Sequence, residues 1–127
     1  MLKHARNFGT PSDEIGELSG LLQSATMLAV DLHINWDERD PQLWELEFIK
    51  NKGAVAGNGS LVLSMLSDAA DLHRKSIVGF AQNMSDCRVP PHEKLLSWYE
   101  RHGFARICVE EHGVQVRRRW RNGSAGR

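Results

Sequence analysis

Residues 44–66 read WELEFIKNKGAVAGNGSLVLSML, and this stretch decides how the chain is organised. Trp44, Leu46 and Phe48 alternate with glutamates, a period of two that predicts a half-buried strand. Residues 53–60 contain three glycines and two alanines and therefore predict a loop with little side-chain bulk. Apolar residues then return at helical spacing from Leu61. The predicted order is strand, glycine loop, helix.

A glycine loop that opens a helix favours the binding of an anion. The first helical amides have no acceptor inside the helix, and the helix dipole is positive at that end. Small residues let the backbone approach a phosphate closely. The loop sequence does not match a Walker loop, because no Lys follows Gly57 or Gly59. It does not match a dinucleotide-binding fingerprint either, because Val62 occupies the position of the third glycine. By itself, the loop is equally consistent with a simple connection.

The residues before this stretch predict a hairpin partner. Residues 28–36 alternate between apolar and polar side chains, and residues 37–41 predict the turn that joins this strand to the next. Residues 1–12 are expected to form a loose arm. Residues 13–24 fit either a short helix capped by Ser12 or a strand over 17–23 that is interrupted by Gly20, and we favour the strand.

The residues after this stretch predict a second helix and three more strands. A buried strand is expected over 76–84, a helix from near Pro91 to His102 that ends at Gly103, and strands over 104–109 and 114–120. Residues 121–127 are expected to be a flexible tail. The predicted fold is a single α/β domain, 1–127, with a mixed, mostly antiparallel sheet flanked by helices.

Composition excludes several classes of protein. The 127 residues include 16 basic and 16 acidic ones, a balance that disfavours a basic nucleic-acid coat. No apolar run approaches the ~20 residues of a membrane helix, and no secretory signal is recognisable. Cys87 and Cys108 are too few for a disulfide framework, so reduced thiols in a cytoplasmic protein are expected. The six histidines form no compact ligand pair, so no metal site is expected.

Two motifs in this order resemble those of the GCN5-related N-acetyltransferase (GNAT) superfamily. Gly57-x-Gly59 resembles part of the family's loop Gln/Arg-x-x-Gly-x-Gly/Ala, and Trp98-Tyr99-x-x-x-Gly103-Phe104 resembles its later motif Leu/Phe-Tyr-x-x-x-Gly-Phe. The resemblance covers about residues 26–120 and includes Val116-Arg117-Arg118 in the last strand. The sequence departs from the family at Ala54, where Gln or Arg is usual, and at His92, where Asn is frequent. The N-terminal part of the family fold is expected to be reduced.

The resemblance implies an acyltransferase that uses acetyl-coenzyme A to acylate an amine. The pantetheine arm would run along the strand end Phe48-Ile49-Lys50, and the diphosphate would bind the loop residues Val55, Ala56, Gly57, Asn58, Gly59 and Ser60. His92 and Lys94 would lie within reach of phosphate or pantetheine.

Three residues are the leading catalytic candidates, and a fourth is the runner-up. Tyr99, the only tyrosine, occupies the family position that donates a proton to the departing thiolate; alternatively it packs the helix onto the sheet. Glu45 and Glu47 are candidate bases for deprotonating the amine, although they also fit an ordinary solvated strand face. His33 is a further candidate for the base.

Uneven charge suggests partners. Residues 31–47 contain six acids and one base, which favours a cationic acceptor or simply solubility. Residues 113–127 contain five arginines and no acid. This pattern is typical of nucleic-acid contact or of an edge strand whose charges prevent aggregation. In a strand, alternation would split these arginines between two faces. The alternative function is therefore a non-catalytic GNAT-like protein that binds protein or nucleic acid through its Arg-rich end. An enzyme that acylates a nucleobase amine, and a homodimer, also stay open.

Overall fold

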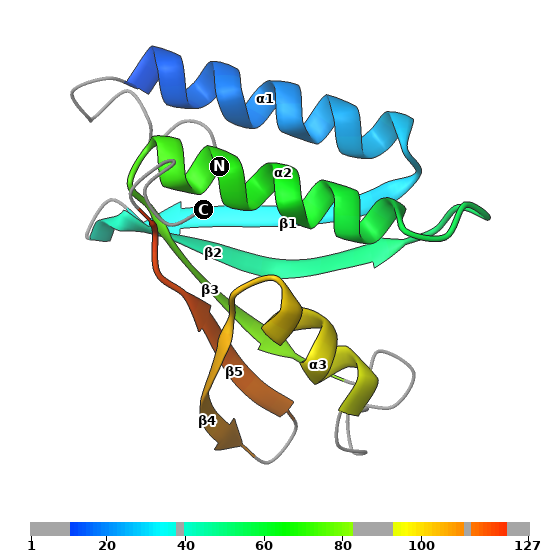
Figure 1. The fold of residues 1–127 in the computed structure, drawn as a ribbon. Helices are drawn as coiled ribbons and strands as arrows, with labels where there is room; N and C mark the ends of the chain where they lie inside the picture. The colour runs from blue at the N-terminus through cyan, green and yellow to red at the C-terminus, as the bar shows by residue number, and fades with distance from the viewer. Residues whose placement is uncertain (1–10, 38–39, 83–92, 111–112, 122–127) are drawn as a thin grey trace.

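A computed structural model describes residues 11–37, 40–82, 93–110 and 113–121. Three helices and five strands follow one another in the order α1 (Pro11–Met27), β1 (Val30–Asp37), β2 (Asp40–Asn51), α2 (Asn58–Leu72), β3 (Ser76–Ala81), α3 (Glu93–Arg101), β4 (Ala105–Glu110) and β5 (Gly113–Arg118). The strands form one sheet in the order β1-β2-β3-β5-β4, shown in Figure 1. Only β2 and β3 are parallel, and the other neighbours are antiparallel. The predicted α/β class with a mixed, mostly antiparallel sheet is confirmed. The end of the strand predicted over 76–84, the start of the helix predicted from near Pro91, most of the arm and most of the tail lie outside the described residues.

The favoured strand over 17–23 is wrong, and the alternative of a helix in residues 13–24 is confirmed, because this segment belongs to α1. Leu18, Leu21 and Ala25 are buried at helical spacing and pack the helix onto the rest of the core. Gly16 and Gly20 lie on the outer side, where a Cβ at either position would meet nothing within 4 Å. Packing of the apolar face therefore outweighs the modest preference of glycine against helix. The predicted arm is also too long, since the helix begins at Pro11.

The predicted hairpin is confirmed with shifted boundaries. β1 begins at Val30 because Ala29 has a left-handed φ of 59°, which separates this strand from α1. The turn is shorter than expected, and Pro41 belongs to β2. A proline is tolerated there because β2 pairs with β3 only from Leu43 onward.

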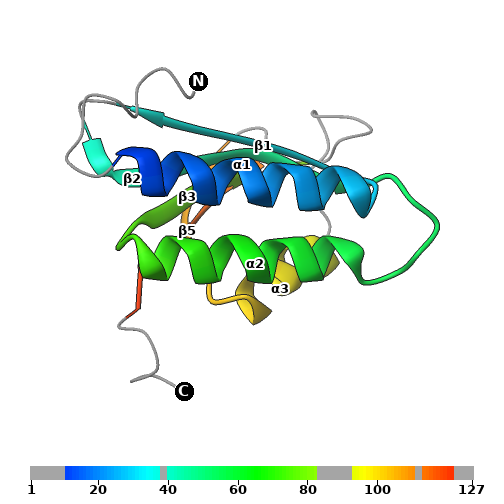
Figure 2. The same ribbon diagram turned by 90° about the horizontal axis from the view of Figure 1, so that it is seen from above.

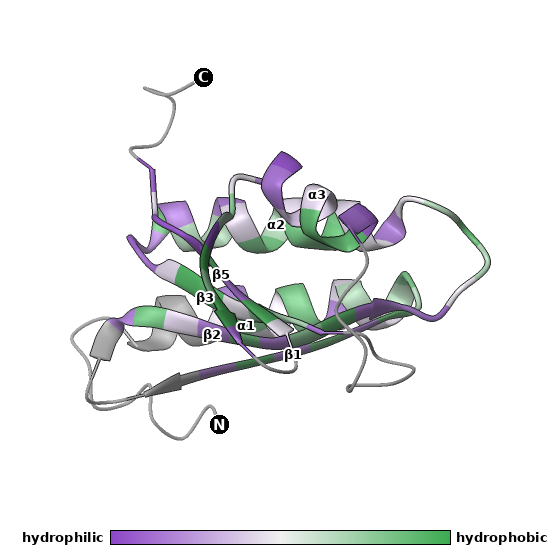
Figure 3. Cartoon of the chain, turned by 90° about the horizontal axis from the view of Figure 1, so that it is seen from below, coloured by the Kyte–Doolittle hydropathy of each residue, from purple (hydrophilic) through white to green (hydrophobic). Residues whose placement is uncertain are grey.

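All three helices lie on one face of the sheet. Figure 2 shows α1 and α2 side by side above the strands. The core beneath α2 contains fully buried side chains from three strands, Trp44 and Leu46 of β2, Ile77 of β3 and Val116 of β5. In Figure 3 the apolar positions of α2 and α3 face the sheet, and their polar positions face outward. None of the described helices is long and apolar enough to cross a membrane.

Candidate functional site

A groove of about 340 Å³ lies where the end of β2 meets the beginning of α2. Ile49, Lys50 and Asn51 of β2 form one wall, and Gly57, Gly59 and Ser60 form the helix end. Leu95 and Trp98 of α3 close the groove from the other side. The groove thus collects residues from three elements at the point that the strand, loop and helix order predicts.

The groove exists because β2 extends beyond the residues that pair with β3. Their parallel ladder runs only from Leu43–Ser76 to Leu46–Gly79, while β2 continues to Asn51. Glu47 is an extra residue in the β1–β2 ladder, since Phe48 pairs with His33 and Leu46 pairs with Ile34. Such a bulge bends a strand and increases its twist. The last residues of β2 therefore continue without β3 beside them.

Side-chain amides hold the glycine loop in place. The Oδ1 of Asn51 accepts a hydrogen bond from the Gly53 amide at 3.1 Å, and its Nδ2 donates to the Val55 carbonyl at 2.9 Å. Further on, the Nδ2 of Asn58 donates to the Leu28 carbonyl at 3.0 Å. These bonds fix the loop to the ends of β2 and α1, so that the amino end of α2 points in a defined direction.

The amino end of α2 offers free amides. Gly57, the N-cap residue, has a φ of 91° that favours glycine, and no side chain caps the helix. The first bond of this helix runs from the Leu61 amide to the Gly57 carbonyl. The amides of residues 58–60 therefore have no acceptor within the helix, and the first turn contains no acidic residue. This end of the groove suits an anionic group.

Trp98 connects α3 to the first turn of α2. Its Nε1 donates a hydrogen bond to the Ser60 hydroxyl at 2.6 Å. A Cβ at position 59 would lie 3.8 Å from the Trp98 ring, which is ordinary contact, so there is room for a small side chain only. The sequence motif included Trp98, but only the three-dimensional contact identifies it as a wall of the groove.

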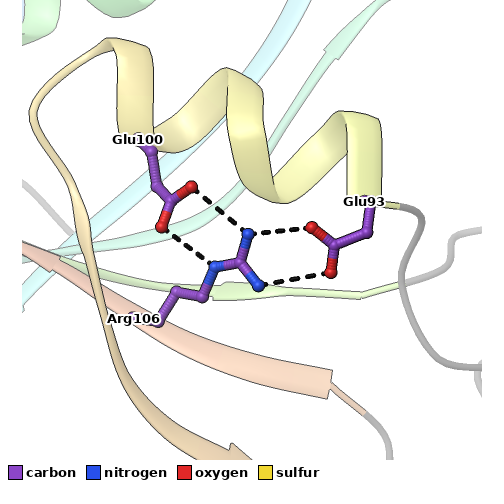
Figure 4. Close-up of polar contacts among 3 residues, drawn as sticks. All are labelled: Glu93, Glu100 and Arg106. Carbon is purple, nitrogen blue, oxygen red and sulfur yellow. Dashed lines mark hydrogen bonds and ion pairs between the residues drawn. The ribbon is translucent and has the colours of Figure 1, made fainter.

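Arg106 fixes α3 relative to the sheet. Its guanidinium binds Glu93 at one end of α3 and Glu100 at the other, with nitrogen to oxygen distances of 2.9 to 3.2 Å, as Figure 4 shows. The hydrogen bonds and the charge of Arg106 lower the pKa of the Glu93 carboxyl. The helix that carries Trp98 is thereby tied to β4.

The predicted cofactor residues divide into two groups. Five of them line the groove: Ile49, Lys50, Gly57, Gly59 and Ser60. The others lie around it, with Phe48 stacked on the ring of His33 at 4.2 Å and Val55, Ala56 and Lys94 exposed. The Asn58 side chain points to Leu28, and His92 lies outside the described residues. Asn51, Leu95 and Trp98 line the groove without having been predicted to do so.

The two candidate bases face a second cavity, on the sheet face opposite the helices. Glu45 and Glu47 line this cavity of about 500 Å³ together with Phe80 of β3 and Glu110 of β4. Gly79, where the β2–β3 ladder ends, also lines it. The sequence did not indicate Glu110, because β4 joins this surface only through the order of the strands. His33, the further candidate base, instead pairs with Asp31 at 3.1 Å.

Tyr99 is buried in the core. Its ring makes edge-to-face contacts with Trp98, at 5.1 Å between centroids, and with Phe104, at 5.3 Å. Burial raises its pKa to about 12. Tyr99 therefore packs α3 onto the sheet, as the alternative interpretation expected, and it keeps its proton at neutral pH. Its role as a proton donor stays a prediction.

The Arg-rich end of the chain is divided between two environments. Arg118 is buried and binds Asp71, whereas Arg117 and Arg119 are exposed. The predicted split of the arginines between faces is confirmed. Among the described residues, no group of three His, Cys, Asp or Glu side chains has the arrangement of a metal site.

No protein-family model matches the sequence, and no curated protein matches it significantly.

Proposed function

We propose that the chain is an acyl-coenzyme A-dependent N-acyltransferase that transfers an acetyl group to an amine. The observation that carries this proposal is the groove in which the free amides of α2 meet the end of β2 that β3 does not pair. The GNAT-like motifs support it, because Gly57-x-Gly59 and Trp98 lie on the two sides of that groove. A cytoplasmic location with access to acetyl-coenzyme A is part of the proposal.

In this proposal the cofactor binds by two kinds of contact. Its diphosphate accepts hydrogen bonds from the amides of residues 58–60, and Lys50 adds positive charge beside them. Its pantetheine arm pairs with backbone groups of β2 at Ile49 and Lys50, where β3 no longer occupies them. The thioester then reaches the point where β2 and β3 separate, next to Glu47 and Gly79.

The acceptor enters from the opposite sheet face. Three carboxylates, from Glu45, Glu47 and Glu110, line the cavity there and favour a cationic amine. Glu47 or Glu45 removes a proton from the ammonium, directly or through water. The amine nitrogen forms a bond to the thioester carbon, the carbon–sulfur bond breaks, and the thiolate takes a proton from Tyr99 or from water. Backbone amides stabilise the oxyanion.

Coenzyme A binding separates this proposal from the alternative of a non-catalytic binding protein. In that alternative, the Arg-rich binding surface has one arginine fewer than the sequence suggests, because Arg118 is buried against Asp71. A homodimer remains a prediction in either case.

Calorimetry with acetyl-coenzyme A tests the proposal. We expect one site per chain, and we expect Gly59→Glu to abolish binding because a carboxylate would occupy the place of the diphosphate. Gly59→Ala is the matched control and should still bind, since a Cβ there meets only ordinary contacts at 3.7 and 3.8 Å. Failure of the native chain to bind acetyl-coenzyme A would contradict the proposal that it is an acyltransferase.

A further inference from the structure

A third cavity, polar and of about 500 Å³, lies between α2, the end of α3 and the segment that follows β5. It shares no lining residue with the groove at the amino end of α2. Ser64 and Ser67 of α2 form one side of the cavity. Its other sides include the basic side chains of Arg101, His102, Arg118 and Arg121.

Two buried polar groups in this wall have no hydrogen-bond partner among the described residues. The side chain of Arg118 is 6% exposed and donates from both terminal nitrogens to Asp71, at 2.8 and 3.0 Å, yet its Nε is unpaired. The Ser67 hydroxyl is buried and unpaired as well. A buried polar group without a partner destabilises the fold, so a ligand that accepts a hydrogen bond would stabilise this site.

The carboxylates of the wall are already engaged. Asp71 accepts from Arg118 and from the Arg121 amide at 2.8 Å, and Glu100 binds Arg106. Asp68 also has an interaction of its own. By contrast, no ion pair of the Arg101 or Arg121 side chain is found within the described ranges of the chain. The three arginines and three carboxylates of the lining balance in formal charge, so Arg101 and Arg121 are the cationic groups that a ligand can still engage.

The arrangement around Gly103 brings two cationic groups together. A Cβ at this position would lie 2.9 Å from Nη2 of Arg121 and 3.4 Å from Nε of Arg118. The φ of 89° at Gly103 also favours glycine. Both guanidinium groups thus lie against the same stretch of backbone. His102, beside them, has a lowered pKa because of its burial and because of the positive charges of Arg101 and Arg118.

We propose that this cavity binds a small oxyanion of the phosphate class between Arg118, Arg121 and Ser67, with Arg101 adding charge. Guanidinium groups bind phosphate oxygens through paired hydrogen bonds, and a serine hydroxyl supplies a further donor. The unpaired Nε of Arg118 and the unpaired hydroxyl of Ser67 both gain a partner when the anion binds. The proposal does not depend on acyl transfer, and its ligand can be free phosphate or the phosphate of a larger ester.

Nuclear magnetic resonance of the native chain tests the site directly. The Nε–H signal of Arg118 is followed during titration with sodium phosphate, and sodium chloride at equal ionic strength is the control. We expect a saturable shift of this signal and of the Ser67 amide in phosphate only. An unchanged signal, or the same shift in chloride, would overturn the proposal.

Matched variants show which arginines bind the anion. Arg121→Gln should weaken phosphate binding about tenfold, the loss of one charge-assisted hydrogen bond, and Arg101→Gln, which removes a charge alone, should weaken it less. Arg117→Gln changes an exposed arginine of β5 that does not line the cavity, and it should leave binding unchanged. An equal loss in all three variants would mean diffuse attraction and would contradict a defined site.

Ribose 5-phosphate and coenzyme A distinguish the sources of the anion. Tighter binding of either ester than of inorganic phosphate, with the same Arg118 shift, supports the site and assigns it to an esterified phosphate. Tighter binding of inorganic phosphate supports the site and assigns it to the free anion.

Discussion

Arg118 of β5 and Asp71 of α2 form a buried, two-pronged ion pair, although they are 47 residues apart in the sequence. Nitrogen to oxygen distances of 2.8 and 3.0 Å and side-chain exposures of 6% and 3% leave both groups almost without water. Desolvation of the two charges opposes the attraction between them, so the pair is a weak source of stability as a whole. Loss of one partner is a different matter, because it leaves an isolated charge in the core.

Asp71→Ala should lower the free energy of unfolding by about 3–5 kcal/mol, the usual cost of an uncompensated buried charge. Urea denaturation, followed by tryptophan fluorescence, measures this change. Asp68→Asn, at an exposed position one turn earlier in α2, is the control and should change stability by less than about 1 kcal/mol. A small effect of Asp71→Ala would show that the Arg118 charge finds water or another anion in the variant.

Tyr99 should make the folded protein sensitive to alkali. Its pKa is 10.0 in an unfolded chain and about 12 in the folded one, so the unfolded state loses the proton first as the pH rises. Stability from this burial is complete below pH 10 and is lost between pH 10 and 12, with a total on the order of 2–3 kcal/mol.

The chain has a single tyrosine, so absorbance at 295 nm reports the ionisation of Tyr99 alone. The titration midpoint should lie well above 10 in the folded chain and fall to the ordinary value in urea. Stability measurements on Tyr99→Phe should lose this part of the alkaline dependence. A midpoint near 10 in the native protein would show that water reaches the hydroxyl.

Sequence order was enough to predict most of the fold and half of the groove. Ile49, Gly57 and Ser60 belong to one continuous strand, loop and helix, so local patterns bring them together. Trp98 is 38 residues away from its partner Ser60, and no local pattern indicates that contact. Contacts of this kind depend on how α3 packs, which Arg106 and the core decide.

Two other differences have the same origin. A helix over residues 13–24 was the alternative and not the favoured prediction because Gly16 and Gly20 weaken the local signal, whereas the packing of Leu18 and Leu21 against the core determines the outcome. Alternation placed Arg118 on the face of Val116, but its burial is intelligible only with Asp71 beside it. A charge on an apolar face can be interpreted only when its partner is known.

Tyr99→Phe also tests the proposed proton donor. The ring contacts with Trp98 and Phe104 remain in this variant, so coenzyme A affinity and folding should be nearly unchanged. Turnover with a thioester donor should fall ~10²-fold, as expected when a general acid is lost. An unchanged turnover would leave Tyr99 with the packing role alone and would make water the proton source.

Glu47→Gln tests whether the bulged residue of β2 is the base. The amide cannot accept the amine proton, so turnover at neutral pH should fall by about 10²–10³-fold while coenzyme A still binds. Glu45→Gln, on the same cavity and two residues earlier, is the matched comparison, and a larger loss in that variant would transfer the role to Glu45.

The role of Glu47 as a base should also show in the pH dependence of turnover, because a rise of the pH increases the fraction of unprotonated amine. The Gln variant should recover part of its activity at high pH, whereas a constant deficit at every pH would argue for an electrostatic effect on acceptor binding. A cationic and a neutral acceptor amine distinguish the base role from the electrostatic effect. Only the cationic amine should lose affinity when a carboxylate of this cavity is neutralised.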